Sequence, residues 1–381
     1  MKKLRRILKF LLLALLVVAV ALAAFGTWRV RRAWPRTTGT IAVRGLSAPV
    51  EVVRDRWGVP SLYAANEHDL FFAQGYVHAQ DRLWQMEFNR RLGAGELSAL
   101  FGRGLLSTDR SLRVLGIRHA AEADWQVLSP STRAILQAYA DGVNAFLGSH
   151  PALPVEFTLL GDQPAPWTPI DSLAWSKMIA FSLGQNQTQE LMRSRLAAKV
   201  GADGVRQLMP PFPSQDREPV IVAPEAGGYG ASRRAALERA GPLLAAVLTE
   251  GAVGVGSNNW VVHGSRTATG KPMLANDTHL ELDMPSVWYE NGLHAGRFDV
   301  AGFSFPGVPM VLIGHNARIA WGISSMCGDA QDLFVETAGG LSSDGMRSKG
   351  MVPRQSRSGP PAGTGASPSW PGARTGIVPA P

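Results

Sequence analysis

The residues best suited to chemistry in this chain lie in the stretch GAVGVGSNNWVV, residues 251–262. A serine hydroxyl is a weak nucleophile that needs a base, and no His–Asp pair is evident beside Ser257 in the sequence. A serine at a chain terminus carries its own base, because its α-amino group has a pKa of about 7.7–8.0. Cleavage of the Gly256–Ser257 bond would create that amine, and Gly256 has no Cβ to obstruct its carbonyl. Two interpretations are open: a self-processing site whose new terminus is the nucleophile, or a polar turn that enters a hairpin.

Other familiar catalytic motifs are absent from the sequence. The patterns GxSxG, GxxxxGK[ST], HExxH and CxxC do not occur, and the single cysteine, Cys327, excludes an internal disulfide. Four histidines are irregularly spaced on different expected strands, which favours ordinary hydrogen bonding over a zinc site; they are His263, His279, His294 and His315.

The charge distribution argues against nucleic acid as a partner. The formal net charge is +8, but the basic excess is confined to the N-terminal region and to residues 341–381. The middle of the chain is nearly balanced, and no basic stripe with interleaved aromatic residues is present. We therefore predict a small-molecule substrate and no nucleic-acid binding.

The N-terminal region, residues 1–36, has the pattern of a signal or anchor segment. An uninterrupted apolar run from Phe10 to Gly26 follows five basic residues. This pattern predicts either a cleaved export signal or a membrane anchor with a cytoplasmic N-terminus. In both cases the remainder is expected to be exported, periplasmic or membrane-anchored and facing outward.

The remaining chain predicts an α+β fold. Residues 37–222 begin with short strands and continue as helices over 67–102, 131–147 and 172–200. A glycine-rich spacer over 223–256 leads to residues 257–337, whose β-branched alternation and turns predict an antiparallel sheet of successive hairpins, with Gly270 at the first turn. Asp69 is the expected cap of the first long helix, and Gly93 and Gly95 its expected end.

The last segment, residues 338–381, breaks this pattern. It is rich in Gly, Pro, Ser and Arg and shows no periodicity. We expect it to be disordered and unable to bury enough apolar surface to offset its ordering entropy. A native tail and an altered reading frame are both open, because the change falls within a series of hairpins.

Several motifs, in order, resemble the penicillin acylase (penicillin amidase) family of N-terminal-nucleophile (Ntn) hydrolases over residues 41–335. The motifs are VVRDRWGVPSLYA, DLFFAQGYVHAQDRLWQMEFNRR, GSNNWVV, TGKPMLANDTHL, GHNARIAWGIS and GDAQDLF. The resemblance implies an Ntn αββα sandwich, incomplete in this chain, with α and β chains cut from one precursor.

The resemblance also implies roles for individual residues. Ser257 would be nucleophile and base, and backbone N–H groups near His279 and Ser325 would stabilise the oxyanion. Three acids match the family's structural Ca²⁺ site, although solvated surface acids are the alternative; they are Glu190, Asp329 and Asp332. His78 is expected to have a structural role.

The implied activity is hydrolysis of linear N-acyl amides through an acyl-enzyme. Candidate substrates are penicillin or cephalosporin side chains and acyl-homoserine lactones, with an acyl pocket drawn from residues 178–187. The family's downstream oxyanion asparagine does not appear, and about half of the usual precursor is missing. The alternative is therefore a truncated, membrane-tethered remnant without catalysis.

Overall fold

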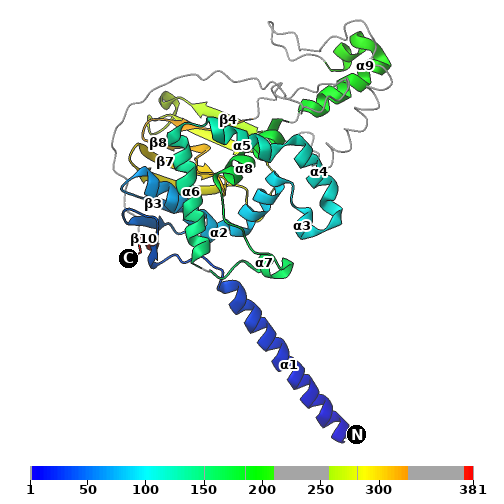
Figure 1. The fold of residues 1–381 in the computed structure, drawn as a ribbon, viewed down its shortest axis with the longest axis vertical. Helices are drawn as coiled ribbons and strands as arrows, with labels where there is room; N and C mark the ends of the chain where they lie inside the picture. Colours follow the sequence, from blue (N-terminus) through cyan, green and yellow to red (C-terminus); the bar gives the residue numbers. More distant parts are fainter. Residues whose placement is uncertain are drawn as a thin grey trace, which may run out of the picture.

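The computed structural model describes residues 2–149, 151–184, 186–209, 257–280, 282–324 and 373–380. Figure 1 shows a body of helices and strands from which one long helix projects. Gly256, Ser325, Asp329 and Asp332, the predicted spacer and most of the predicted tail lie outside the described residues.

The projecting helix is α1, Lys2–Arg31, and it contains the apolar run. Its segment Lys3–Arg31 is long and apolar enough to cross a membrane, and none of its most apolar window is buried against the body. A signal sequence has the same properties, so both predicted roles of this segment stay open.

The body contains an eight-stranded mixed sheet with the order β1-β10-β2-β3-β6-β7-β8-β9. The pairs β1–β10 and β3–β6 are parallel and the other pairs are antiparallel. The α+β prediction is confirmed, and the strands predicted after residue 288 are antiparallel as expected. The strand bounds are β1 Gly39–Val43, β2 Val50–Arg54, β3 Pro60–Tyr63, β6 Tyr289–Ala295, β7 Phe298–Ser304, β8 Ile313–Asn316, β9 Ala320–Trp321 and β10 Ala373–Pro379.

Strand β10 corrects the prediction that residues 338–381 are disordered throughout. It lies between β1 and β2, and alternate residues, Thr375 and Ile377, are 3% and 1% exposed. This short alternation is enough to form a strand, because β1 and β2 supply backbone hydrogen-bond partners on both edges of β10. The sheet therefore includes a segment, Ala373–Pro379, that the sequence pattern had predicted to be disordered.

Helices cover one face of this sheet, and Figure 1 shows α6 lying over the strands. The longest helix of the body, α2, is Glu67–Ala94. It begins at the cap Asn66, whose Oδ1 accepts from Asp69 N at 2.8 Å, and it ends at Gly95 in the left-handed conformation. Asn66 thus replaces the predicted cap Asp69, whereas the predicted end at Gly95 is confirmed. The other helices are α3 Ser98–Phe101, α4 Leu106–Leu115, α5 Ile117–Val127, α6 Pro130–Gly148, α7 Val155–Leu160, α8 Pro169–Gly184 and α9 Asn186–Leu208.

The carboxylate of Asp69 accepts hydrogen bonds from a preceding loop. It accepts from the backbone N–H groups of Ser47 and Ala48, both at 2.9 Å, and from the Ser47 hydroxyl at 2.6 Å. Burial alone would raise the pKa of Asp69, but these hydrogen bonds dominate and lower it to about 2.

Two glycines let α2 and α6 approach closely. A Cβ on Gly75 would lie 2.1 Å from Tyr139 O, and one on Gly142 would lie 1.8 Å from Phe72 O. No larger residue fits at either position without displacing backbone. The resulting helix pair packs on the sheet to form the main core, which includes Val50, Leu62, Phe71, Phe72 and Leu293.

Candidate functional site

Ser257 is the first residue of a separate two-stranded hairpin. Strand β4, Ser257–Val262, pairs antiparallel with β5, Met273–Thr278, and Ser257 lies opposite Thr278. The connection contains a 3-10 turn, Gly264–Arg266, and Gly270 has a φ of 69°. The hairpin prediction, with Gly270 in the turn, is confirmed.

The register brings His279 next to the candidate nucleophile, because it directly follows Thr278. Its Nε2 lies 3.1 Å from Asp277 Oδ2 and 3.3 Å from Asn258 Nδ2. The imidazole is thus engaged with its own hairpin. The predicted role belongs to the backbone N–H of His279 and stays a prediction.

Asn276 joins the hairpin to the segment that leads to Ser325. Its Nδ2 donates to Asn258 O at 3.0 Å and to Ile323 O at 2.9 Å, and its Oδ1 accepts from Ile323 N at 2.9 Å. The Ser324 hydroxyl lies 3.4 Å from Ser257 O. The residue immediately before Ser325 therefore lies beside the candidate nucleophile.

Sequence reasoning did not assign this role to Asn276. The residue lies within the quoted motif TGKPMLANDTHL, but nothing in the motif indicates which side chain binds a distant backbone. Gly322 permits the contact, because a Cβ there would lie 2.7 Å from Asn259 Nδ2 and 2.9 Å from Asn276 Cβ.

Comparison with known proteins identifies the family of this chain. The sequence model of the penicillin amidase family matches residues 49–357. The chain belongs to the penicillin amidase family. The match covers the described site residues Ser257 and His279 and also the unplaced Ser325.

The individual proteins that this chain resembles are named as acylases. The chain is 37% identical to the penicillin acylase 2 proenzyme of Pseudomonas sp. (strain SE83), over 80% of this chain and 40% of that protein. It is 36% identical to the acyl-homoserine lactone acylase QuiP of Pseudomonas aeruginosa, over 83% of this chain and 39% of that protein. A solved structure of thermostable penicillin G acylase from Alcaligenes faecalis is 31% identical and covers 45% of this chain and 96% of that chain, with a TM-score of 0.38. This penicillin amidase family chain thus spans about two fifths of the length of the curated relatives it matches.

The predicted calcium ligands are only partly described in this amidase-family chain. Glu190 lies on α9, Asn186–Leu208, and is partly buried, while Asp329 and Asp332 fall outside the described residues. Within the described ranges no group of three or more His, Cys, Asp or Glu side chains could hold a metal ion. The ligand set stays a prediction that rests on the family resemblance.

His78 has the structural role that was predicted. It is completely buried, and its Nδ1 lies 2.8 Å from the Tyr139 hydroxyl, which itself accepts from Gly307 N at 2.9 Å. The Ser304 hydroxyl donates its proton to Tyr289 O at 3.0 Å. Its 3.3 Å contact with His78 therefore assigns the ring N–H to Nε2, and Nδ1 accepts from the Tyr139 O–H. Burial and the nearby Arg82 lower the pKa of His78 to about 3, so it stays neutral near neutral pH.

A second buried polar group was missed at the sequence level. Arg54 of β2 makes two hydrogen bonds to Asp81 of α2, at 2.8 and 3.0 Å, and the Tyr289 hydroxyl donates to the same carboxylate. Burial, then the neighbouring Asp81 charge, raises the pKa of Tyr289. The group joins β2, α2 and β6, although its members are far apart in sequence.

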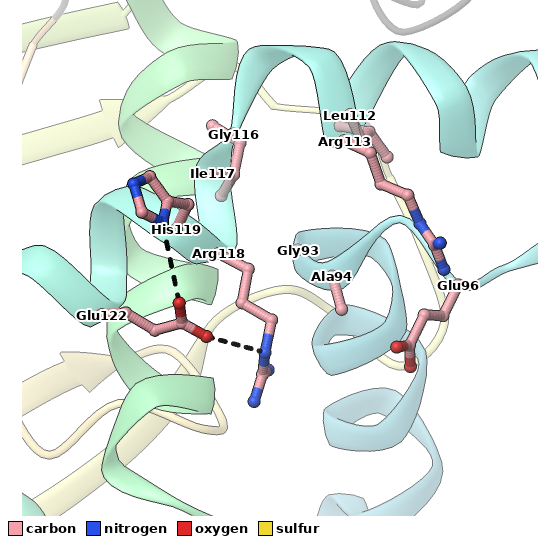
Figure 2. Close-up of a pocket in the computed structure, with 10 residues that line it drawn as sticks. All are labelled: Gly93, Ala94, Glu96, Leu112, Arg113, Gly116, Ile117, Arg118, His119 and Glu122. Atoms are coloured by element: carbon pink, nitrogen blue, oxygen red, sulfur yellow. Dashed lines mark ion pairs between the residues drawn. The ribbon is translucent and has the colours of Figure 1, made fainter. Parts of the chain in front are cut away.

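The cavity in Figure 2 is separate from the hairpin. It has a volume of about 290 Å³ and is lined by residues of α2, α4 and α5 and their connections, with none from β4 or β5. Glu122 pairs with His119 at 3.8 Å and with Arg118 at 3.7 Å, and Arg118 also binds Asp171 at 2.8 Å. Three of its charged or titratable lining residues, Arg118, His119 and Glu122, thus pair with one another.

The predicted acyl pocket begins inside the core. Met178, its first residue, is 5% exposed and packs in a cluster with Trp175, Phe305 and Val308. Met178 is therefore a core residue, and the rest of the 178–187 pocket stays a prediction.

Proposed function

We propose that this chain is an Ntn-type amidohydrolase that cleaves linear N-acyl amides through an acyl-enzyme on Ser257. The observation that carries the proposal is the register of the hairpin, in which Ser257 begins β4 opposite Thr278. Ser257 lies at the start of a strand, beside His279 and residues 322–324. The backbone N–H groups of these neighbours can stabilise an oxyanion that forms next to the Ser257 hydroxyl. Family membership supplies the reaction class.

The first reaction would be self-processing. The Ser257 hydroxyl attacks the Gly256 carbonyl carbon, and the acyl group moves from nitrogen to oxygen as the nitrogen takes up the proton. Water then hydrolyses the ester, which leaves Gly256 as a carboxylate and Ser257 with a free amine. Near neutral pH a useful fraction of that amine is unprotonated and can act as the base.

Turnover would repeat this chemistry on a substrate amide. The amine takes the Ser257 proton while Oγ attacks the acyl carbon, and the backbone N–H groups of His279 and Ser325 stabilise the oxyanion. The leaving amine receives the proton, and water attacks the acyl-enzyme. The names of the relatives point to penicillin-type amides or acyl-homoserine lactones as the substrate class.

The accessory parts of the proposal are calcium and export. Glu190, with Asp329 and Asp332, would hold a structural Ca²⁺ through carboxylate oxygens, the ligand type that this ion prefers. The apolar helix α1 supports export as a signal or anchor, so the site would act outside the cytoplasm.

Intact-mass analysis of the purified chain and of Ser257→Ala tests the proposal. We expect two fragments from the parent, divided between residues 256 and 257, and one uncleaved chain from Ser257→Ala. Ser257→Cys is expected to retain cleavage, since a thiol can also attack the carbonyl. Ser265→Ala is the matched control, because Ser265 lies on the same hairpin but bonds His263 at 3.0 Å.

The same experiment separates the two sequence-based hypotheses. Cleaved parent protein with amidase turnover that Ser257→Ala lacks supports the enzyme. A single parent chain of 40.8 kDa without turnover would instead identify the inactive remnant.

A further inference from the structure

The base of α1 is bonded to a short helix that exposes apolar side chains. The Arg29 guanidinium donates to Thr158 Oγ1 at 2.8 Å and to Leu153 O at 3.3 Å. Thr158 belongs to α7, Val155–Leu160, and Figure 1 shows α7 beside the point where α1 meets the body. These bonds fix α7 relative to the helix that can cross a membrane.

The depth of this contact follows from the sequence of α1. The apolar run ends at Gly26, and Arg29 is three residues later, a rise of about 4–5 Å. When the run lies in the hydrocarbon layer, Arg29 lies at the level of the lipid headgroups, where arginine is favoured. Because α7 is bonded to Arg29, it lies at the same level.

The side chains at this level are those that favour a membrane interface. Phe157 anchors α7 in the core, whereas Leu159 is 78% exposed and Leu160 is 37% exposed. On α1 and just after it, Trp28 and Trp34 are 51% and 63% exposed. Tryptophan is enriched at membrane interfaces, and an apolar helical face at this depth can bury itself among lipid headgroups.

Cations accompany these aromatic rings. Arg32 lies over the Trp28 ring, 4.9 Å from its centroid, and Arg31 lies over Trp34 at 5.7 Å. Guanidinium groups in this position attract the phosphates of an anionic bilayer. Among the neighbouring acids, Asp162 is already bound by Arg91 at 3.0 Å, and Glu156, on α7 itself, is half-buried, so both oppose this attraction less than free surface acids would.

We propose that α7 is a second membrane contact, which rests on an anionic phospholipid surface beside a retained α1. The contact involves Leu159 and Leu160, is held in place by Arg29, and fixes the orientation of the body on the bilayer. Figure 1 shows β4 at the opposite end of the body from α1, so the Ser257 hairpin would face away from the lipid. This inference rests on the anchor role of α1 within the proposed function, but not on the proposed reaction at Ser257.

Spin-label depth measurements on the full chain test the proposal. The chain is placed in nanodiscs of phosphatidylcholine with a minority of phosphatidylglycerol, in a Cys327→Ser background. A nitroxide is attached at Leu159→Cys or, as a control of matched exposure on α4, at Val114→Cys, where the parent valine is 83% exposed. We expect the label at 159 to be several-fold less accessible to a water-soluble nickel quencher than the label at 114, and more accessible to oxygen.

Two further results complete the test. Adding Arg29→Ala should move the label at 159 toward the accessibility of the label at 114, whereas adding His119→Ala should not. Equal accessibility at 159 and 114, or no response to Arg29→Ala, would overturn the proposal. Recovery of the native protein as a chain from which residues 1–31 have been removed would also overturn it.

Discussion

The eight-stranded sheet and the β4–β5 hairpin differ in how they are held. In the sheet, helices cover one face, and Val50, Leu62 and Leu293 are at most 1% exposed. In the hairpin, Trp260, Val261 and Met273 are 52–66% exposed. Burial therefore stabilises the sheet, whereas the described part of the hairpin has little apolar burial.

Specific hydrogen bonds hold the hairpin instead. Asn276 connects it to Ile323, and the Trp288 indole N–H donates to Thr278 Oγ1 at 3.0 Å. The candidate nucleophile is thus positioned by a few polar contacts, while the buried histidine His78 belongs to the framework. Three changes test this division, in order of expected effect.

The largest effect is expected where the framework is tightest. Gly142→Ala would place a methyl group 1.8 Å from Phe72 O and force α2 and α6 apart, at a cost of about 3 kcal/mol of unfolding free energy. Urea unfolding followed by circular dichroism measures the change. Gly148→Ala, on the same helix with nothing within 4 Å, should be neutral or stabilising by up to about 1 kcal/mol. Equal effects at the two positions would mean that the close helix contact is not formed.

A second test uses the pH dependence of the framework. His78 has a folded pKa of about 3, below its unfolded value of about 6.5, so between these values the unfolded chain binds one more proton. Stability should therefore fall as the pH drops through this window, by about 1.4 kcal/mol per pH unit from this residue. Asp69 contributes separately, because its stabilisation is lost only as the pH falls from about 3.8 toward about 2.

His78→Gln should flatten the slope of unfolding free energy between about pH 6 and pH 4.5. It should also lower stability at pH 7 by about 1–3 kcal/mol, because buried partners lose hydrogen bonds. His119→Gln is the control, since its side chain is 89% exposed. An unchanged slope in His78→Gln would contradict a neutral buried histidine.

The smallest effect is expected at β10. Thr375 is 3% exposed, and its hydroxyl has no partner within the described part of the chain. Thr375→Val removes this cost and should raise the unfolding free energy by about 1 kcal/mol. The reverse exchange on the exposed hairpin, Val261→Thr, should change it by less than about 0.5 kcal/mol. Destabilisation by Thr375→Val would show that the hydroxyl is bonded in solution.

Local patterns predicted the elements that are stabilised locally. Apolar residues at helical spacing predicted most of α2, and Gly270 with its flanking strands predicted the hairpin. The cap was assigned to Asp69 instead of Asn66 because both have the required chemistry and only the loop geometry separates them. Asp69 instead binds Ser47, a partner 22 residues away.

Features that depend on distant partners could not be predicted. Strand β10 owes its burial to the gap between β1 and β2, and a pattern containing Thr375 and Gly376 carries little strand signal alone. Likewise, Arg54 and Asp81 meet only once the sheet and α2 are packed. At the site, the glycine-rich approach and the family resemblance predicted Ser257 as the nucleophile, which stays a prediction, while the contacts of Asn276 required the fold.

The position of β10 also determines the order in which the strands of the sheet can pair during translation. Strands β1 and β2 are consecutive in the chain, yet β10 lies between them, and Arg374 pairs with Glu51 across 323 residues. While the chain is being made, the β2–β3 hairpin and α2 can form early, but β1 has no neighbouring strand among the described residues until residues 373–379 emerge. Closing so long a loop is slow. Among the described strands, the edge formed by β1 is therefore completed after the others, and it stays open until β10 has emerged.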